Sequence, residues 1–161
     1  MREELVFGPI HSRRLGSSLG INLLPTKGKL CNFDCVYCEC GWNKDGRGDR
    51  KLPTAGELHE TLEAKLKECS GAGTPIDSIL FPESEADLNP DFAEIIDITI
   101  ALRDKYIPQA KVSVLSNATR IFREDVFEAL RKVDNPILKI DAPTDELAGR
   151  INQPQGEYHV E

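Results

Sequence analysis

The sequence predicts an α/β fold in the form of a partial (β/α) barrel. Short apolar runs alternate with segments of helical periodicity that are long enough to connect parallel strands. Polar residues follow the ends of these runs, where parallel α/β folds carry functional side chains. With 161 residues, 40% hydrophobic and 29% charged, the chain suits a single domain over residues 1–161. Because an eight-stranded barrel takes about 250 residues, we expect a barrel short of its C-terminal strands.

The expected elements follow from periodicity and from start and stop signals. The apolar run 19–24 is the first strand, and Thr54 with Glu57 forms a capping box for a helix over 53–69. Asn89 before Pro90 predicts the start of a second helix over 90–106. The remaining elements are strands at 76–81, 111–115 and 136–140, a helix with Val126, Leu130 and Val133 on one face, and a helix that begins at Thr144. We expect the strands to pair in parallel through right-handed crossovers.

Composition also predicts where the protein resides in the cell and what kind of site it carries. The sequence has no apolar run of about 18 residues and no signal peptide at its start, so we expect a cytoplasmic protein with no membrane contact. Four of its five cysteines fall between residues 31 and 40, and the fifth, Cys69, lies on the apolar face of a predicted helix. In a reducing compartment such a cluster indicates a metal site rather than disulfides.

Cys31, Cys35 and Cys38 form a C-x3-C-x2-C triplet. Thiolates favour thiophilic metals, and three of them on one loop can hold three irons of a 4Fe–4S cluster and leave the fourth iron open to a ligand. Two alternatives remain, and both use Cys40 as a fourth ligand. One is a structural zinc site, and the other is a four-cysteine electron carrier.

The triplet, with Tyr37 before its last cysteine, resembles the radical S-adenosylmethionine superfamily. The flanking stretches 8–16 and 18–21, with Pro25 and Gly41, look like the group that includes the tRNA wyosine synthases. The resemblance implies an iron–sulfur oxidoreductase. Such an enzyme reductively cleaves S-adenosylmethionine to a 5'-deoxyadenosyl radical, which then abstracts hydrogen from a substrate.

The resemblance also implies roles for individual residues. Cys31, Cys35 and Cys38 would ligate the cluster. Tyr37 would lie near the adenine, and Ser116 and Asn117 would contact the ribose or carboxylate. Asp141 would lie in the substrate region and is counted with the cofactor-binding residues. No catalytic residue is assigned.

One stretch departs from the family pattern. After the strand at 76–81 the family carries a glycine-glycine-glutamate turn that grips the amino group of the cofactor. Here Glu85 keeps the glutamate position, Glu83 lies nearby, and Pro82 and Ser84 stand where glycines are expected. We therefore expect weaker cofactor binding. The alternative function is a non-catalytic iron–sulfur protein.

Charge is unevenly distributed and predicts a docking region. Residues 1–52 carry 9 basic and 6 acidic side chains (+3), whereas residues 53–161 carry 11 and 21 (−10). The basic side chains in or near the cysteine segment are Arg13, Arg14, Lys27, Lys29, Lys44, Arg47, Arg50 and Lys51. We expect this segment to dock a flavodoxin-like, low-potential electron donor, or the phosphates of a tRNA if the substrate is RNA rather than a small molecule.

Overall fold

The computed structural model describes residues 4–25, 29–46, 51–82 and 86–160. In this part of the chain five strands form one sheet in the order β1-β2-β3-β4-β5. The strands are β1 Val6–Ser12, β2 Gly16–Ile21, β3 Ser78–Phe81, β4 Lys111–Ser116 and β5 Asn135–Leu138. Strands β2 to β5 are parallel, and β1 is antiparallel to β2. The sheet is open, which confirms the predicted α/β class and the partial barrel.

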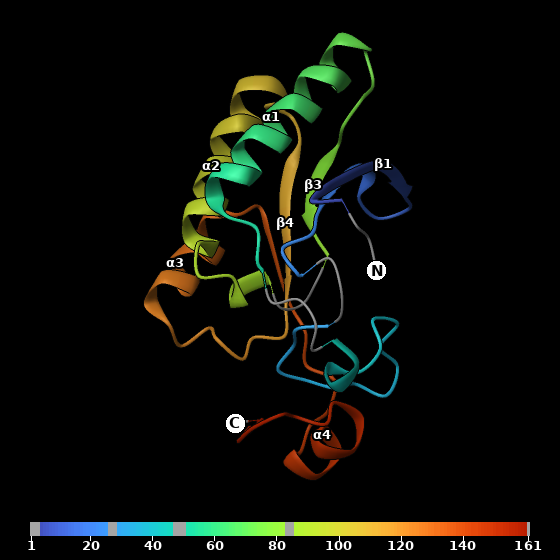
Figure 1. Cartoon of the computed structure of the whole chain (residues 1–161), viewed down its shortest axis with the longest axis vertical. Helices are drawn as coiled ribbons and strands as arrows, with labels where there is room; N and C mark the ends of the chain where they lie inside the picture. The colour runs from blue at the N-terminus through green and yellow to red at the C-terminus, as the bar shows by residue number, and fades with distance from the viewer. Residues whose placement is uncertain (1–3, 26–28, 47–50, 83–85, 161) are drawn as a thin grey trace.

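Three helices cover one face of the sheet, as Figure 1 shows. They are α1 Ala55–Gly71, α2 Phe92–Tyr106 and α3 Glu124–Lys132. A fourth helix, α4 Asp145–Ile151, lies apart from them at the lower end of the view, beside the segment that carries the cysteines. Two short 3-10 helices, η1 Asn43–Gly46 and η2 Ala86–Leu88, precede α1 and α2. No helix in the described ranges is long and apolar enough to cross a membrane.

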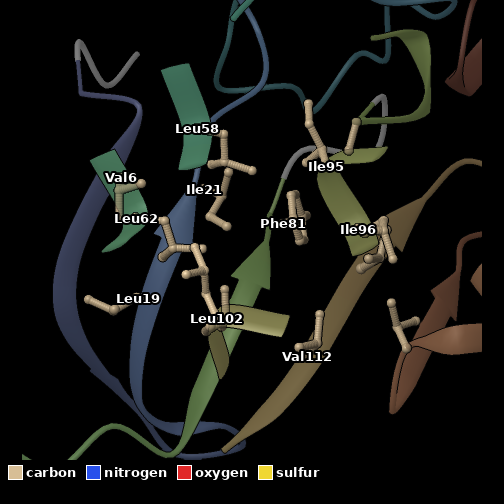
Figure 2. Packing of buried hydrophobic residues seen from close by; sticks show 14 of the residues in the cluster. Val6, Leu19, Ile21, Leu58, Leu62, Phe81, Ile95, Ile96, Leu102 and Val112 are labelled. Atoms are coloured by element: carbon tan, nitrogen blue, oxygen red, sulfur yellow. The ribbon is translucent and has the colours of Figure 1, made fainter. Parts of the chain in front are cut away.

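The core lies between the sheet and helices α1 to α3. Alternate strand residues point toward the helices, so Leu19 and Ile21 of β2 and Phe81 of β3 are buried against Leu58 and Leu62 of α1. Figure 2 shows these side chains meeting Ile95, Ile96 and Leu102 of α2 and Val112 of β4. Cys69 is buried in the same cluster, as predicted. This packing fixes the sheet and sets the positions of the strand ends.

The predicted helix starts are confirmed at two places and corrected at one. Thr54 Oγ1 accepts from the Glu57 backbone N–H at 3.2 Å, and the Glu57 carboxylate accepts from the Thr54 N–H at 2.9 Å, which completes the capping box. Thr144 likewise caps α4. Asn89 is not the cap of α2, which follows Asp91. Asn89 forms a turn instead, because its Oδ1 accepts from the Asp91 N–H.

The strand at the N-terminal edge was missed, because only Val6 and Phe7 at its start are buried and a proline interrupts its pattern. Pairing with β1 moves β2 to Gly16–Ile21, three residues earlier than the predicted 19–24 at each end. The Phe7 ring lies over Gly20, where a Cβ atom would come within 2.0 Å of it. Glycine at this position therefore lets the edge strand fold back onto the sheet.

Candidate metal centre and adjoining cavity

The three cysteines of the triplet lie in residues 29–46, here called the cysteine loop, which comes after β2 in the sequence and ends with η1. In Figure 1 this loop lies against α4 and the residues that follow it. Residues 151–155, here called the strap, bond to its backbone. The contacts are Val36 N–H to Ile151 O at 2.9 Å, Asp34 N–H to Asn152 O at 2.9 Å and Gln155 N–H to Asn32 O at 2.8 Å. The far end of the chain thus holds the shape of the cysteine loop.

Asp34, between the first two cysteines of the triplet, organises the interior of the loop. Its Oδ1 accepts from the backbone N–H of Asn43 at 2.8 Å, from Asn43 Nδ2 at 3.0 Å and from Lys29 Nζ at 3.3 Å. Its Oδ2 accepts from Gln155 Nε2 at 3.0 Å. Asn43 Oδ1 in turn accepts from the Cys31 N–H at 2.9 Å. One buried carboxylate therefore connects the start of the loop, its end and the strap.

The three thiols of the triplet differ in exposure and in hydrogen bonding. Cys31 is buried, and its Sγ accepts from the Phe33 N–H at 3.2 Å. Cys35 is half-buried and accepts from Asn152 Nδ2 at 3.3 Å, whereas Cys38 is half-buried and Cys40 is exposed. N–H donors favour the thiolate over the thiol. Cys31 and Cys35 each accept a hydrogen bond from an N–H group, as ligating sulfurs in metal sites commonly do.

The thiols are not gathered around one point. Within the described ranges, no three His, Cys, Asp or Glu side chains lie close enough to hold a single metal ion. A zinc ion takes all its thiolates at one centre, whereas a cubane cluster takes each thiolate on a different iron. Two of the three triplet thiols accept from N–H donors, and three thiols on one loop are the donor chemistry that an iron–sulfur cluster takes.

Tyr37 and Asp141 meet at the outer side of the loop. The Tyr37 hydroxyl donates to the Asp141 carboxylate just past β5, and Lys139 Nζ donates to the same hydroxyl and lies 4.3 Å from the centroid of the Tyr37 ring. Burial and the bond to Asp141 raise the pKa of Tyr37 well above its usual range. Burial opposes ionisation of Asp141, but bonds from Tyr37, Asn152 and Lys139 outweigh it and hold its pKa below the ordinary value. Two residues predicted to bind cofactor are thus brought into contact.

Ser116 and Asn117 lie at the end of β4, facing the segment after β3. Ser116 Oγ donates to Asp87 Oδ2 at 3.0 Å, and burial raises the pKa of the Asp87 carboxyl. Asn117 Oδ1 accepts from the backbone N–H and the hydroxyl of Thr119. Within the described part of the chain, Asp87 Oδ1 and Asn117 Nδ2 are buried and have no hydrogen-bond partner. Such groups are costly unless a ligand or water satisfies them.

A cavity of about 360 Å³ opens between the cysteine loop and the sheet face that points away from α1 and α2. The residues that line it include Ser18, Gly20 and Asn22 of the β2 region, Leu80 and Pro82 at β3, and Cys40 of the loop. Because these strand residues alternate with core residues, this is the inner face of the partial barrel. The cavity is small and mostly apolar, and Cys40 is the cysteine that lines it.

Of the predicted site residues, the structure places the three triplet cysteines, Tyr37 and Asp141 in one connected region. A bond from Asn32 Nδ2 to Thr119 Oγ1 at 2.6 Å ties this region to the loop that carries Ser116 and Asn117. Glu83 and Glu85, and the departure at 82–85 apart from Pro82, lie outside the described residues.

Sequence reasoning misplaced one residue and missed others. Lys29 was expected in the exposed basic segment, but its side chain is only 3% exposed and paired with Asp34, because the loop folds over it. Asp34, Asn43, Asp87 and Asn152 were not singled out. No sequence signal used here marks these four residues, because their contacts come from segments that are far apart in the chain.

Comparison with known proteins identifies the family. The model of the radical SAM superfamily matches residues 26–160, so this chain belongs to that superfamily. It is 30% identical over 152 residues to the UPF0026 protein of Methanocaldococcus jannaschii, covering 93% of this chain and 44% of that protein. It is 31% identical to the UPF0026 protein of Helicobacter pylori J99 (93% and 46%) and 32% identical to that of Synechocystis (97% and 55%).

The chain therefore spans about half the length of the curated relatives it matches. No solved structure matches it at a significant level. The narrower likeness to the wyosine synthase group stays a prediction.

Proposed function

We propose that this protein binds a 4Fe–4S cluster through Cys31, Cys35 and Cys38 and uses it to cleave S-adenosylmethionine reductively, as a radical SAM enzyme. The observation that carries the proposal is the position of the triplet. Within a chain of this superfamily, three thiols share one loop at the rim where the parallel strands end. Parallel α/β folds carry their chemistry at that rim.

The bound groups would supply an electron from the reduced cluster to the sulfonium of S-adenosylmethionine, breaking its bond to the ribose carbon and yielding methionine and a 5'-deoxyadenosyl radical. The chain itself donates hydrogen bonds to the sulfurs and holds the cysteine loop in place. Phe33 N–H and Asn152 Nδ2 donate to two of the three sulfurs. The strap and Asp34 fix the loop, and a mostly apolar cavity lies beside Cys40.

The unsatisfied polar atoms at the strand ends support the cofactor part of the proposal. Asp87 Oδ1 can accept from an ammonium or hydroxyl group, and Asn117 Nδ2 can donate to a carboxylate or hydroxyl oxygen. S-adenosylmethionine carries all three groups. Tyr37, held by Asp141, presents an aromatic ring that is half exposed, which suits stacking against a nucleobase.

The test is anaerobic reconstitution of the wild-type chain and of two matched variants, Cys35→Ala and Cys40→Ala, each removing one thiol from the same loop. We expect about four irons per chain in the wild type and in Cys40→Ala, and loss of most of the iron in Cys35→Ala. With dithionite and S-adenosylmethionine, the wild type and Cys40→Ala would form 5'-deoxyadenosine, and Cys35→Ala would not. Equal iron loss in both variants would favour a four-cysteine electron carrier, and stoichiometric zinc without iron would overturn the proposal.

The same experiment separates the enzyme from the non-catalytic alternative. A stable cluster in the wild type, with no 5'-deoxyadenosine formed, would indicate an iron–sulfur protein whose cofactor site has been lost. Replacing Pro82 and Ser84 with glycine then tests the cause. Recovery of cleavage would locate the defect in the turn after β3.

A further inference from the structure

We propose that the side-chain amide of Asn152 raises the reduction potential of the cluster held by the cysteine loop, by donating a hydrogen bond to the sulfur of Cys35. Hydrogen bonds to ligating sulfurs are one of the means by which a protein sets the potential of an iron–sulfur cluster. The inference rests on the proposed function and deepens it, because it assigns an electronic role to a residue that does not itself ligate the metal.

Asn152 directs its amide nitrogen at the cysteine loop. Its Nδ2 lies 3.3 Å from Cys35 Sγ, donates to Asp141 Oδ2 at 2.5 Å and lies 3.5 Å from the Tyr37 hydroxyl. Sulfur and carboxylate are both acceptors, so these neighbours favour the NH2 group of the amide, and not its carbonyl oxygen, on this side. Asn152 is only 3% exposed, so little water is available to replace the bond to sulfur.

This donor differs from the N–H group at Cys31. The Phe33 N–H, 3.2 Å from Cys31 Sγ, belongs to the backbone of the loop and stays in place as long as the loop keeps its shape. The Asn152 donor is a side chain, whereas the backbone of Asn152 holds the loop separately, through its carbonyl oxygen and the Asp34 N–H at 2.9 Å. Replacing the side chain therefore removes the bond to sulfur and leaves the backbone contact of the strap.

The direction of the effect follows from charge. One-electron reduction transfers an electron from the reductant to the cluster, so the cluster and its thiolates become more negative by one unit. An N–H group points the positive end of its dipole at the sulfur, so its bond is stronger when the cluster is reduced. The Asp141 carboxylate, paired with Lys139 Nζ at 3.3 Å, is present with and without the Asn152 amide. Loss of the amide should therefore lower the potential.

The test is an EPR-monitored redox titration of the reconstituted proteins, a readout that does not depend on enzymatic activity. Asn152→Leu removes the donor and keeps a side chain of similar size. Asn135→Leu is the matched control, because the Asn135 amide donates to Ser113 Oγ at 3.0 Å at the start of β5, away from the rim where the strands end. We expect a more negative potential in Asn152→Leu and no shift in Asn135→Leu. At a fixed potential, the ratio of reduced to oxidised cluster should fall by about threefold to tenfold in Asn152→Leu.

A second pair of variants separates the bond to sulfur from the bond to Asp141. Asp141→Asn and the double variant Asp141→Asn with Asn152→Leu both lack the carboxylate, so they differ only in the Asn152 amide. The double variant should have the more negative potential of the two. Equal potentials in this pair would overturn the proposal, because Asn152 would then act through Asp141 and not through Cys35. Equal potentials in wild type and Asn152→Leu would overturn it as well.

Loss of the cluster would be a different result from a change in its potential. If both Asn152 variants fold, as judged by circular dichroism, but bind no iron, Asn152 builds the site rather than tuning it, and the proposal is overturned. If the wild type itself binds no iron, the proposed function is refuted instead.

Discussion

The side-chain amide of Asn152 donates a hydrogen bond to Cys35 Sγ at 3.3 Å, although the two residues are 117 positions apart in the chain. The same amide donates to the Asp141 carboxylate, which also accepts from Tyr37. One side chain after α4 thus connects a cysteine of the triplet with the segment just past β5. The candidate centre is therefore assembled by tertiary packing as much as by the triplet.

Replacing Asn152 with Ala should destabilise this assembly. The change leaves Asp141 and Cys35 each without one donor in a region where Asn152 is buried, so the free energy of unfolding should fall by about 1–3 kcal/mol. Urea unfolding of the apoprotein measures this change, and the rate of iron release to a chelator measures the effect on the cluster. Gln109→Ala, at an exposed position, is the control. Equal stability and iron release in wild type and Asn152→Ala would show that the bond does not hold the loop.

Asp141 should contribute stability that depends on pH. Its pKa is lower in the folded chain than in the unfolded chain, so its contribution is fully present above the unfolded value of about 3.9 and is lost as pH falls through the folded pKa. Wild type should exceed Asp141→Asn by about 1 kcal/mol at pH 7, and the difference should narrow below pH 4. Thermal unfolding of both proteins from pH 7 to pH 3.5 measures it. A difference that does not change with pH would contradict the assignment.

Asp87 should behave in the opposite sense. Burial raises its pKa in the folded chain, so its charge destabilises the fold increasingly as pH rises from about 4 through the folded pKa. Asp87→Asn keeps an oxygen that accepts from Ser116 and removes the charge. The variant should be more stable than wild type at pH 7, by on the order of 1 kcal/mol, and equal to it near pH 4.

The same substitution should weaken binding of S-adenosylmethionine by about tenfold, because the site loses a charged acceptor for the amino group. Equilibrium dialysis with the loaded protein measures the affinity. If Asp87→Asn gains stability but binds S-adenosylmethionine as tightly as the wild type, Asp87 does not contact the cofactor. The raised pKa of Asp87 would still be supported.

Electron donation should depend on the basic side chains of the cysteine loop and the segment after it. Lys44 is exposed beside Trp42, with Nζ 6.0 Å from the ring centroid, and Arg47 and Arg50 follow in the sequence. Replacing all three by Ser should slow reduction by an acidic flavodoxin about tenfold at low salt, with the difference lost at high salt. Replacement of Lys65, Lys67 and Lys132, on α1 and α3, makes an equal change of charge elsewhere. Equal slowing by both triple variants would mean that net charge, and not a docking site, is responsible.

The parallel part of the fold was predictable because it depends on local signals. The capping box at Thr54, the helical spacing of Leu58, Leu62 and Leu66, and the apolar run at Ile79 all report burial against a neighbouring layer. Strand β1 was not predictable in this way. Most of its residues are exposed, and its pairing with β2 depends on Phe7 meeting Gly20 across the hairpin.

In the candidate site, too, residues with a local sequence signal were predictable and residues defined by tertiary contacts were not. Spacing singled out the cysteine triplet as a candidate, and position after a strand singled out Ser116, Asn117 and Asp141. Neither signal could identify Lys29 as buried, because in sequence it is one of several basic residues near the cysteines. Its environment exists only once Asp34, Asn43 and Gln155 converge from separate segments.

The most direct test of the central claim is the EPR spectrum of the anaerobically reconstituted, dithionite-reduced protein, recorded with and without S-adenosylmethionine. If the triplet leaves one iron open and the adjoining strand ends bind the cofactor, a reduced 4Fe–4S signal should appear and should change when S-adenosylmethionine is added. A cluster signal that is indifferent to the cofactor, or a protein that holds no iron, would contradict the account.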